Sequence, residues 1–168
     1  QLLLQNTERI FIDGTSNLPY KTGFSHGSSV GDFNNDGIND LFINNLGDDD
    51  LTPSYFLYNN GDGDFIEPSS VNDSLEKDFN PTGGLSGALF TESFDINNDN
   101  RVDVFLGEVG DGKYAYLRNN GEGFDVVMDD NLAWPGSSSG LFGYKTLDFN
   151  MDGLTDILAF GTKNDLID

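Results

Sequence analysis

The stretch Asp32-Phe-Asn-Asn-Asp-Gly-Ile-Asn-Asp-Leu-Phe-Ile43 decides the interpretation of this sequence, because it returns twice. The second copy is Asp95-Ile-Asn-Asn-Asp-Asn-Arg-Val-Asp-Val-Phe-Leu106, and the third is Asp148-Phe-Asn-Met-Asp-Gly-Leu-Thr-Asp-Ile-Leu-Ala159. All three share the pattern D-x-N-x-D-[GN]-x-x-D, followed by apolar residues. Copies spaced by 63 and 53 residues indicate a fold built from similar units.

A second element, rich in Asn and Gly, alternates with the first. It reads Phe56-Leu-Tyr-Asn-Asn-Gly-Asp-Gly-Asp-Phe65 and returns as Tyr116-Leu-Arg-Asn-Asn-Gly-Glu-Gly-Phe124. A weaker copy opens the chain as Leu3-Leu-Gln-Asn-Thr-Glu-Arg-Ile-Phe11. Because Asn and Gly accept a positive φ at low cost, each copy predicts the turn of a β-hairpin.

These repeats predict an all-β fold. The apolar runs that begin at Asp40, Asp103 and Asp156 have the length of strands and follow a turn. No stretch of 11 residues carries an apolar stripe with helical spacing. Each period of about 57 residues then holds about four strands, which is the content of one β-propeller blade.

The expected number of blades divides the chain into segments and predicts that these segments form only part of a propeller. Propellers close with about four to eight blades, and this chain supplies about three, so we expect it to be part of a larger ring. The single propeller segment spans residues 1–168, in which 1–13 end one blade, 24–68 and 86–128 form two whole blades, and 139–160 begin a further blade.

The repeated loop carries oxygen side chains at alternating positions. Positions 1, 3, 5 and 9 are Asp, Asn, Asp and Asp in every copy, and position 7 would offer its backbone carbonyl. Ligation by carboxylates, an amide and a carbonyl favours Ca²⁺ over zinc or copper, and the small octahedral shell of Mg²⁺ fits it less well. The predicted ligands are Asp32, Asn34, Asp36, Ile38 and Asp40 in the first loop, Asp95, Asn97, Asp99, Arg101 and Asp103 in the second, and Asp148, Asn150, Asp152, Leu154 and Asp156 in the third.

Position 6 sets the sharp turn of the loop. Gly37 and Gly153 occupy it in two copies, and Asn100 replaces Gly in the other, where it can still adopt a left-handed conformation. The first half of the loop also matches an EF-hand. An EF-hand, however, needs flanking helices and a bidentate Glu at position 12, where this chain has only apolar residues followed by strand formers.

Composition and charge narrow the class of partner. The 168 residues hold 29 acidic and 8 basic side chains, a formal net charge of −21. Binding to nucleic acid or to an anionic membrane needs clustered Lys and Arg, so both are excluded as partners. No apolar run approaches the ~20 residues of a membrane span, and we find no signal-peptide pattern.

The absence of Cys excludes disulfides and thiolate zinc sites. His26 is the one histidine of the sequence, which argues against a His-based metal site or a Ser-His-Asp triad. The six Glu are scattered along the sequence, so they do not identify a catalytic pair of carboxylates like that of a glycosidase.

The repeated loops resemble the FG-GAP and VCBS repeats, the calcium-loop blades of integrin α-subunit propellers and of many bacterial surface proteins. The matching motifs are Gly31-Asp-Phe-Asn-Asn-Asp-Gly-Ile-Asn-Asp-Leu-Phe, Phe94-Asp-Ile-Asn-Asn-Asp-Asn-Arg-Val-Asp-Val-Phe and Leu147-Asp-Phe-Asn-Met-Asp-Gly-Leu-Thr-Asp-Ile-Leu. The hairpin Leu57-Tyr-Asn-Asn-Gly-Asp-Gly-Asp-Phe also looks like the second signature of the VCBS type. The resemblance covers nearly the whole chain. It implies that each loop joins the first two strands of a blade at the propeller rim and holds Ca²⁺ at positions 1, 3, 5, 7 and 9.

Two departures from the family pattern are Asn100 in place of Gly and the weak hairpin copy that opens the chain. The first implies that the second site binds calcium less tightly. The family is functionally mixed, so the resemblance supplies no ligand for the propeller itself.

We therefore expect a calcium-binding module of an extracellular or cell-surface protein, with about three structural Ca²⁺ ions. Millimolar external calcium would saturate even sites with dissociation constants of about 10⁻⁴–10⁻³ M. Its expected role is adhesion or recognition of a protein or glycan, without catalysis by this chain and with further blades in the same parent chain or by association. Two alternatives stay open: a scaffold or accessory part of a secreted carbohydrate-active enzyme, and a purely structural spacer.

Overall fold

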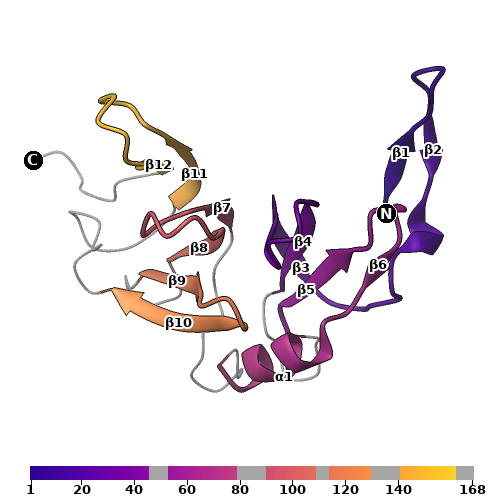
Figure 1. The fold of residues 1–168 in the computed structure, drawn as a ribbon, viewed down its shortest axis with the longest axis horizontal. Coiled ribbons are helices and arrows are strands. Elements are labelled where there is room, and N and C mark those ends of the chain that lie inside the picture. Colours follow the sequence, from indigo (N-terminus) through magenta and orange to yellow (C-terminus); the bar gives the residue numbers. More distant parts are fainter. Residues whose placement is uncertain (46–52, 79–89, 109–113, 130–140, 162–168) are drawn as a thin grey trace, which may run out of the picture.

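The computed structural model describes residues 1–45, 53–78, 90–108, 114–129 and 141–161 (Figure 1). These residues form an all-β fold with a single α-helix among them, α1 (Ser69–Asp78), and a short 3₁₀ helix at Thr15–Asn17. The strands are β1 (Leu3–Gln5), β2 (Phe11–Asp13), β3 (Ser25–Gly31), β4 (Asp40–Asn45), β5 (Tyr55–Asn59), β6 (Phe65–Ile66), β7 (Glu92–Phe94), β8 (Asp103–Glu108), β9 (Tyr114–Asn119), β10 (Phe124–Asp129), β11 (Leu141–Leu147) and β12 (Asp156–Gly161).

The strands form four antiparallel sheets in which each strand pairs with its neighbour in the sequence. We call them the N-terminal pair (β1–β2), sheet I (β3-β4-β5-β6), sheet II (β7-β8-β9-β10) and the C-terminal pair (β11–β12). Equivalent registers in sheets I and II show that they are copies of one unit. Asp40 pairs with Gly31 in sheet I, and Asp103 pairs with Phe94 at the same point of sheet II. The described residues do not close a ring.

Sheets I and II pack face to face. Successive strand residues point to opposite faces, and each sheet is apolar on both. The front face of sheet I, with Phe42 and Phe56, contacts the rear face of sheet II, with Val104, Leu106 and Leu117, and all five side chains are buried. The aromatic rings of Phe56 and Phe124 stack across this interface with centroids 4.3 Å apart.

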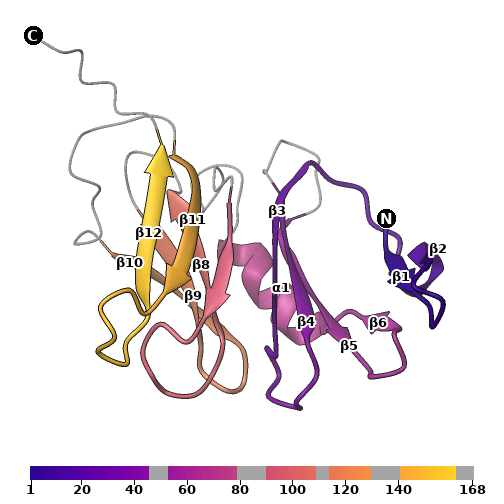
Figure 2. The same cartoon turned by 90° about the horizontal axis from the view of Figure 1, so that it is seen from above.

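The same front-to-rear packing continues on the other side of sheet II. Its front face, with Phe105 and Tyr114, packs against Tyr144 and Ile157 of the C-terminal pair. Figure 2 shows the sheets standing side by side, with the three Asp-rich loops at one common end. The first strands of successive units also touch, since the Ser93 hydroxyl on β7 donates to the Val30 carbonyl on β3. Among the described residues, sheet II is therefore covered on both faces, whereas sheet I is covered by a sheet on its front face alone.

Helix α1 is an element that the sequence pattern did not predict. Its ten residues carry few apolar side chains, so they show no long helical stripe. Val71 and Leu75 are one turn apart and are buried in the core between sheets I and II. The Asn72 side chain accepts from the Phe56 backbone N–H at 2.9 Å and donates to the Phe56 carbonyl at 3.2 Å. The helix thus continues the hydrogen bonding of β5 beyond the short strand β6. In the described part of the chain, no helix is long and apolar enough to cross a membrane.

Candidate metal centres

The first Asp-rich loop, between β3 and β4, is organised by its own side chains. The Asp32 carboxylate accepts hydrogen bonds from the backbone N–H groups of Asp36 at 3.0 Å and Gly37 at 2.8 Å. The Asn34 amide accepts from the Asp36 N–H at 3.0 Å and donates to the Asp36 carboxylate at 2.9 Å. The Asp36 carboxylate in turn accepts from the Ile38 N–H at 2.8 Å. Positions 1, 3 and 5 are therefore linked in one network, as alternating inward-pointing oxygen groups require.

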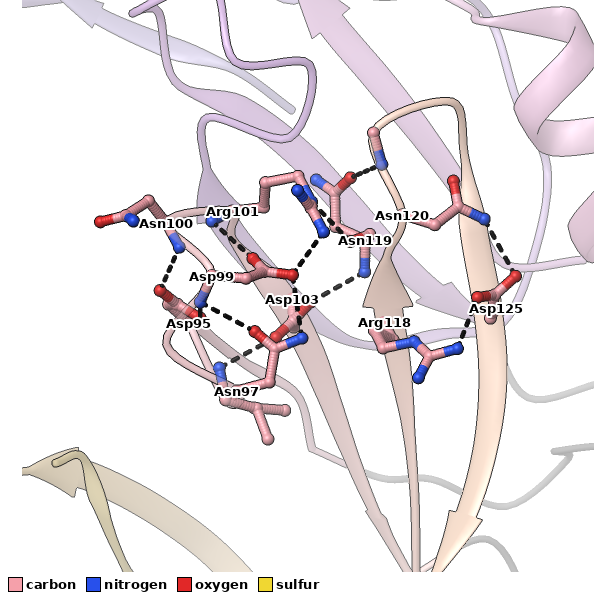
Figure 3. Close-up of polar contacts among 12 residues, drawn as sticks. Asp95, Asn97, Asp99, Asn100, Arg101, Asp103, Arg118, Asn119, Asn120 and Asp125 are labelled. Carbon is pink, nitrogen blue, oxygen red and sulfur yellow. Dashed lines mark hydrogen bonds and ion pairs between the residues drawn. The ribbon is translucent and has the colours of Figure 1, made fainter.

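The second and third loops repeat this network bond by bond. The backbone N–H groups at positions 5 and 6 donate hydrogen bonds to the Asp carboxylate at position 1. These bonds measure 3.0 and 2.7 Å in the second loop, and 3.0 and 2.8 Å in the third. The amide at position 3 donates to the carboxylate at position 5 at 2.9 Å in both loops. Similar sequences have thus produced one local geometry in three places, which Figure 3 shows for the second loop.

The backbone of each loop turns sharply at positions 4 and 6, where φ is positive. At position 6 the values are +87° for Gly37, +65° for Asn100 and +88° for Gly153. The prediction that Asn100 adopts the left-handed conformation is confirmed. The sequence pattern did not single out position 4, where Met151 has φ +62° in the third loop, an unusual value for a side chain of this kind.

The Asp at position 9 ties the loop to the hairpin turn of the same sheet. Asp40 is fully buried, and its carboxylate accepts from the backbone N–H of Phe33 at 3.0 Å and of Asn59 at 2.9 Å. Asp103 has the same two kinds of donor, at 2.9 Å from Ile96 and at 2.8 Å from Asn119. Burial is the main cause that raises the pKa of both carboxyls, and the backbone donors oppose it. A cation near position 9 would therefore also offset the cost of burying this charge.

A buried asparagine in the hairpin turn is a structural residue that the sequence analysis did not single out. The Asn119 amide donates to the Phe33 carbonyl in the first loop at 2.9 Å and to the Val102 carbonyl at 3.2 Å. It therefore joins sheet II to the loop of sheet I. Asn59 is equivalent in sequence and makes the second kind of contact, to the Asn39 carbonyl at 3.2 Å. The sequence feature that could have identified Asn119 and Asn59 is the Asn-Asn-Gly motif, which is repeated in the two hairpin turns.

An ion pair distinguishes the second loop. The Arg101 guanidinium lies against the Asp99 carboxylate, one of the proposed ligands, and its Nε donates to the Asn119 carbonyl at 2.9 Å (Figure 3). Ile38 and Leu154 occupy this position in the other loops and bring no charge. A cation bound at Asp99 would therefore compete with a resident guanidinium in the second loop alone.

The donor set suits a hard cation, but the carboxylates are not gathered into a ready-made site. Within the described residues, no group of three or more His, Cys, Asp or Glu side chains lies close enough together to hold a metal ion. Both carboxylate oxygens of Asp32 and of Asp40 accept backbone hydrogen bonds, so a cation would have to share them with these donors. The role of the position 7 carbonyls as ligands stays a prediction, as does calcium binding.

No known family model matches this chain, and no curated protein matches it. The likeness to FG-GAP and VCBS repeats therefore stays a prediction from the residues of the repeated motifs.

Proposed function

We propose that this chain is a calcium-stabilised β-propeller module of an extracellular or cell-surface protein, and that it serves in binding a protein or glycan. The observation that carries the calcium proposal is the threefold repetition of one loop geometry. Each copy places three Asp and one Asn at positions 1, 3, 5 and 9 of a nine-residue loop.

Electrostatics supports a structural cation in these loops. Nine carboxylates are concentrated in three short loops of a chain whose formal net charge is −21. Three divalent ions would reduce this charge by six and remove the repulsion where it is densest. Because the loops form only when the chain folds, the free energy of binding calcium would add to the stability of the folded state.

The packing of the sheets supports the propeller part of the proposal. Sheets I and II and the C-terminal pair stack front to rear, with their first strands adjacent and their Asp-rich loops at one end (Figure 2). Such radial stacking of antiparallel meanders is the arrangement of propeller blades. A rigid module of this kind suits recognition because it presents loops on a fixed scaffold.

Calcium dependence can be tested by thermal unfolding and calorimetric titration of the whole chain. Calcium should raise the melting temperature, EGTA should lower it, and the stoichiometry should be close to three. Asp36→Ala and Asp152→Ala should each remove one site. Asp62→Ala is the matched control, since it removes an exposed Asp from a hairpin turn outside the loops. A melting temperature that is the same in calcium and EGTA would refute the calcium proposal.

The binding role needs a separate measurement. The calcium-loaded chain should bind to at least one member of a panel of immobilised acidic and neutral polysaccharides and extracellular-matrix proteins, and EGTA should weaken this binding. If no member of the panel binds the folded chain more strongly than it binds the heat-denatured chain, the recognition role is contradicted and a structural spacer is favoured.

A further inference from the structure

Asn119 contacts two of the Asp-rich loops. Within its own sheet it holds the end of the second loop. Its backbone N–H donates to the Asp103 carboxylate at 2.8 Å, and its carbonyl accepts from the Arg101 Nε at 2.9 Å (Figure 3). Its side chain donates to the Val102 carbonyl at 3.2 Å. Positions 7, 8 and 9 of the second loop are therefore all bonded to this one residue.

The same side chain reaches the first loop. The Asn119 amide donates to the Phe33 carbonyl at 2.9 Å, in a hydrogen bond that is buried. Phe33 is position 2 of the first loop and lies between Asp32 and Asn34. Its backbone N–H donates to the Asp40 carboxylate at position 9, at 3.0 Å. The two peptide groups on either side of Phe33 thus connect the last Asp of the first loop with Asn119.

Two further contacts hold the first and second loops together. The Ser93 hydroxyl donates to the Val30 carbonyl, and each of these residues lies two positions before the first Asp of its loop. Gly31 directly precedes the first loop, and a Cβ atom on it would lie 2.7 Å from the Val102 side chain, at position 8 of the second loop. Because Gly31 has no side chain, the two loops can pack closely against each other.

The third loop offers an internal comparison. It has the same network of hydrogen bonds as the other two. Among the described residues, however, the hydrogen bonds of its Asp and Asn side chains all lie within the loop, and none reaches the first or second loop. A change that is transmitted by hydrogen bonds should therefore pass between the first and second loops and should affect the third loop less.

We propose that Asn119 couples the first and second loops, so that calcium binding at one of them favours calcium binding at the other. This inference rests on the calcium sites proposed above. When the first loop is ordered by a cation, Phe33 is fixed as well, because it lies between two of the proposed ligands and is bonded to a third. The Phe33 carbonyl then holds the Asn119 side chain, and Asn119 holds the end of the second loop.

The second loop consequently loses less conformational freedom when it binds its own cation, which gives positive cooperativity. Coupling between binding sites is reciprocal, so the second loop favours binding at the first by the same factor. One neutral hydrogen bond transmits this effect between the loops, and its net contribution corresponds to a factor of about two to ten in affinity.

Charge alone predicts the opposite sign. The three carboxylates of the first loop and one bound Ca²⁺ give a formal charge of −1. Asp36→Ala leaves two carboxylates, so the loop without an ion has a formal charge of −2. A more negative first loop would strengthen cation binding at the loop beside it. Weaker binding at the second loop after Asp36→Ala therefore reports coupling through contacts.

NMR titration of the full chain with calcium tests the coupling at each loop separately. The amide signals of Gly37, Asn100 and Gly153 report on the three loops, because each amide donates to the first Asp of its loop, at 2.8, 2.7 and 2.8 Å. Asp36→Ala should raise the calcium concentration at the midpoint of the Asn100 signal by about two- to tenfold. Asp152→Ala makes the same change in the third loop and should move this midpoint clearly less. No increase after Asp36→Ala, or equal increases in the two variants, would overturn the coupling.

Asn119→Ala tests whether this side chain carries the coupling. Its backbone hydrogen bonds stay, and in this background Asp36→Ala should no longer raise the Asn100 midpoint, which closes a double-mutant cycle. Asn59→Ala is the matched control. The Asn59 side chain makes the equivalent bonds to its own turn and its own loop, and in the described structure it makes none to another Asp-rich loop. The effect of Asp36→Ala should therefore persist with Asn59→Ala. If it persists equally with Asn119→Ala, Asn119 is not the coupling residue.

Hydrogen exchange in EGTA tests the same coupling without any metal. Asn119→Ala should speed exchange of the Gly37 amide by about two- to tenfold, because the first loop loses its hydrogen bond to sheet II. The Gly153 amide shows whether the whole chain has been destabilised. If the exchange rates of Gly37 and Gly153 rise by the same factor, the effect is global and the coupling is overturned.

The outcomes separate this proposal from the calcium proposal. If no amide signal responds to calcium, the metal sites are refuted, and the exchange rates in EGTA still decide whether the loops are coupled. If the signals of all three loops respond to calcium but the Asn100 midpoint ignores Asp36→Ala, only the coupling is refuted.

Discussion

Replacing Arg101 with Leu should strengthen calcium binding at the second loop. Arg101 pairs with Asp99, and the side chains of Arg101 and Asp99 are 36% and 25% exposed. Leu is the residue that the third loop has at this position, as Leu154. The substitution therefore makes the second loop resemble the third and removes one positive charge next to a proposed ligand.

The magnitude follows from the distance between the guanidinium and the ion. A Ca²⁺ ion lies about 2.4 Å from a carboxylate oxygen. The Arg101 Nη2 lies 2.5 Å from the same carboxylate, so the two cations would be about 5 Å apart. At this separation in water, a double and a single charge repel by about 1.7 kcal/mol. If the side chain swings into solvent instead, the cost is that of breaking a partly exposed ion pair, roughly 0.5 kcal/mol. The expected gain in affinity therefore lies between about twofold and twentyfold.

Calorimetric titration of the full chain measures this gain. The weakest of three macroscopic dissociation constants should be the one that Asp99→Ala removes, and Arg101→Leu should lower it. Arg118→Leu is the matched control, because it removes the same charge from the same sheet. Arg118 pairs at 2.8 Å with Asp125, which lies outside the loops. If Arg101→Leu leaves the constant unchanged, or if Arg118→Leu lowers it equally, competition between Arg101 and the cation is not the cause.

Three further substitutions test the packing that positions the loops. Asn119→Ala should lower the free energy of unfolding by about 1–3 kcal/mol in urea titrations, because it leaves the buried Phe33 carbonyl without its donor, whereas Asn59→Ala should cost clearly less. Gly107→Ala should lower the melting temperature, because φ is +70° and a Cβ would lie 2.5 Å from the Tyr144 hydroxyl; a melting temperature equal to that of the parent chain would contradict this contact. Leu75→Ala should cost about 2–5 kcal/mol if α1 is part of the core, and a loss below ~1 kcal/mol would show that the helix is only loosely attached.

Local features were predictable because they depend on residues that are close in the sequence. The positive φ at Gly37, Asn100 and Gly153 and the hairpin turns after Asn59 and Asn119 follow from the conformational freedom of Asn and Gly. The strands that begin at the last Asp of each loop followed from short apolar runs after a turn. The repeat of these signals predicted the all-β class.

Contacts between units could not be predicted from the local sequence in the same way. Helix α1 carries few apolar residues, and its Val71 and Leu75 are buried in the core between sheets I and II, a contact that the local sequence does not show. The ion pair of Arg101 depends on where the loop directs a long side chain, and the bond from Asn119 to Phe33 joins residues 86 positions apart.

The sequence by itself determined the repeating unit of this protein, with its three Asp-rich loops, its Asn-Gly turns and its apolar strands. These are properties of segments of about ten residues, in which backbone conformation and side-chain spacing leave few alternatives. The tertiary structure alone decided which faces of the units are covered. Burial of Phe42 and exposure of Leu158 arise from equivalent sequence positions, and they differ because, in the part of the chain that the structure describes, only Phe42 has a sheet packed in front of it.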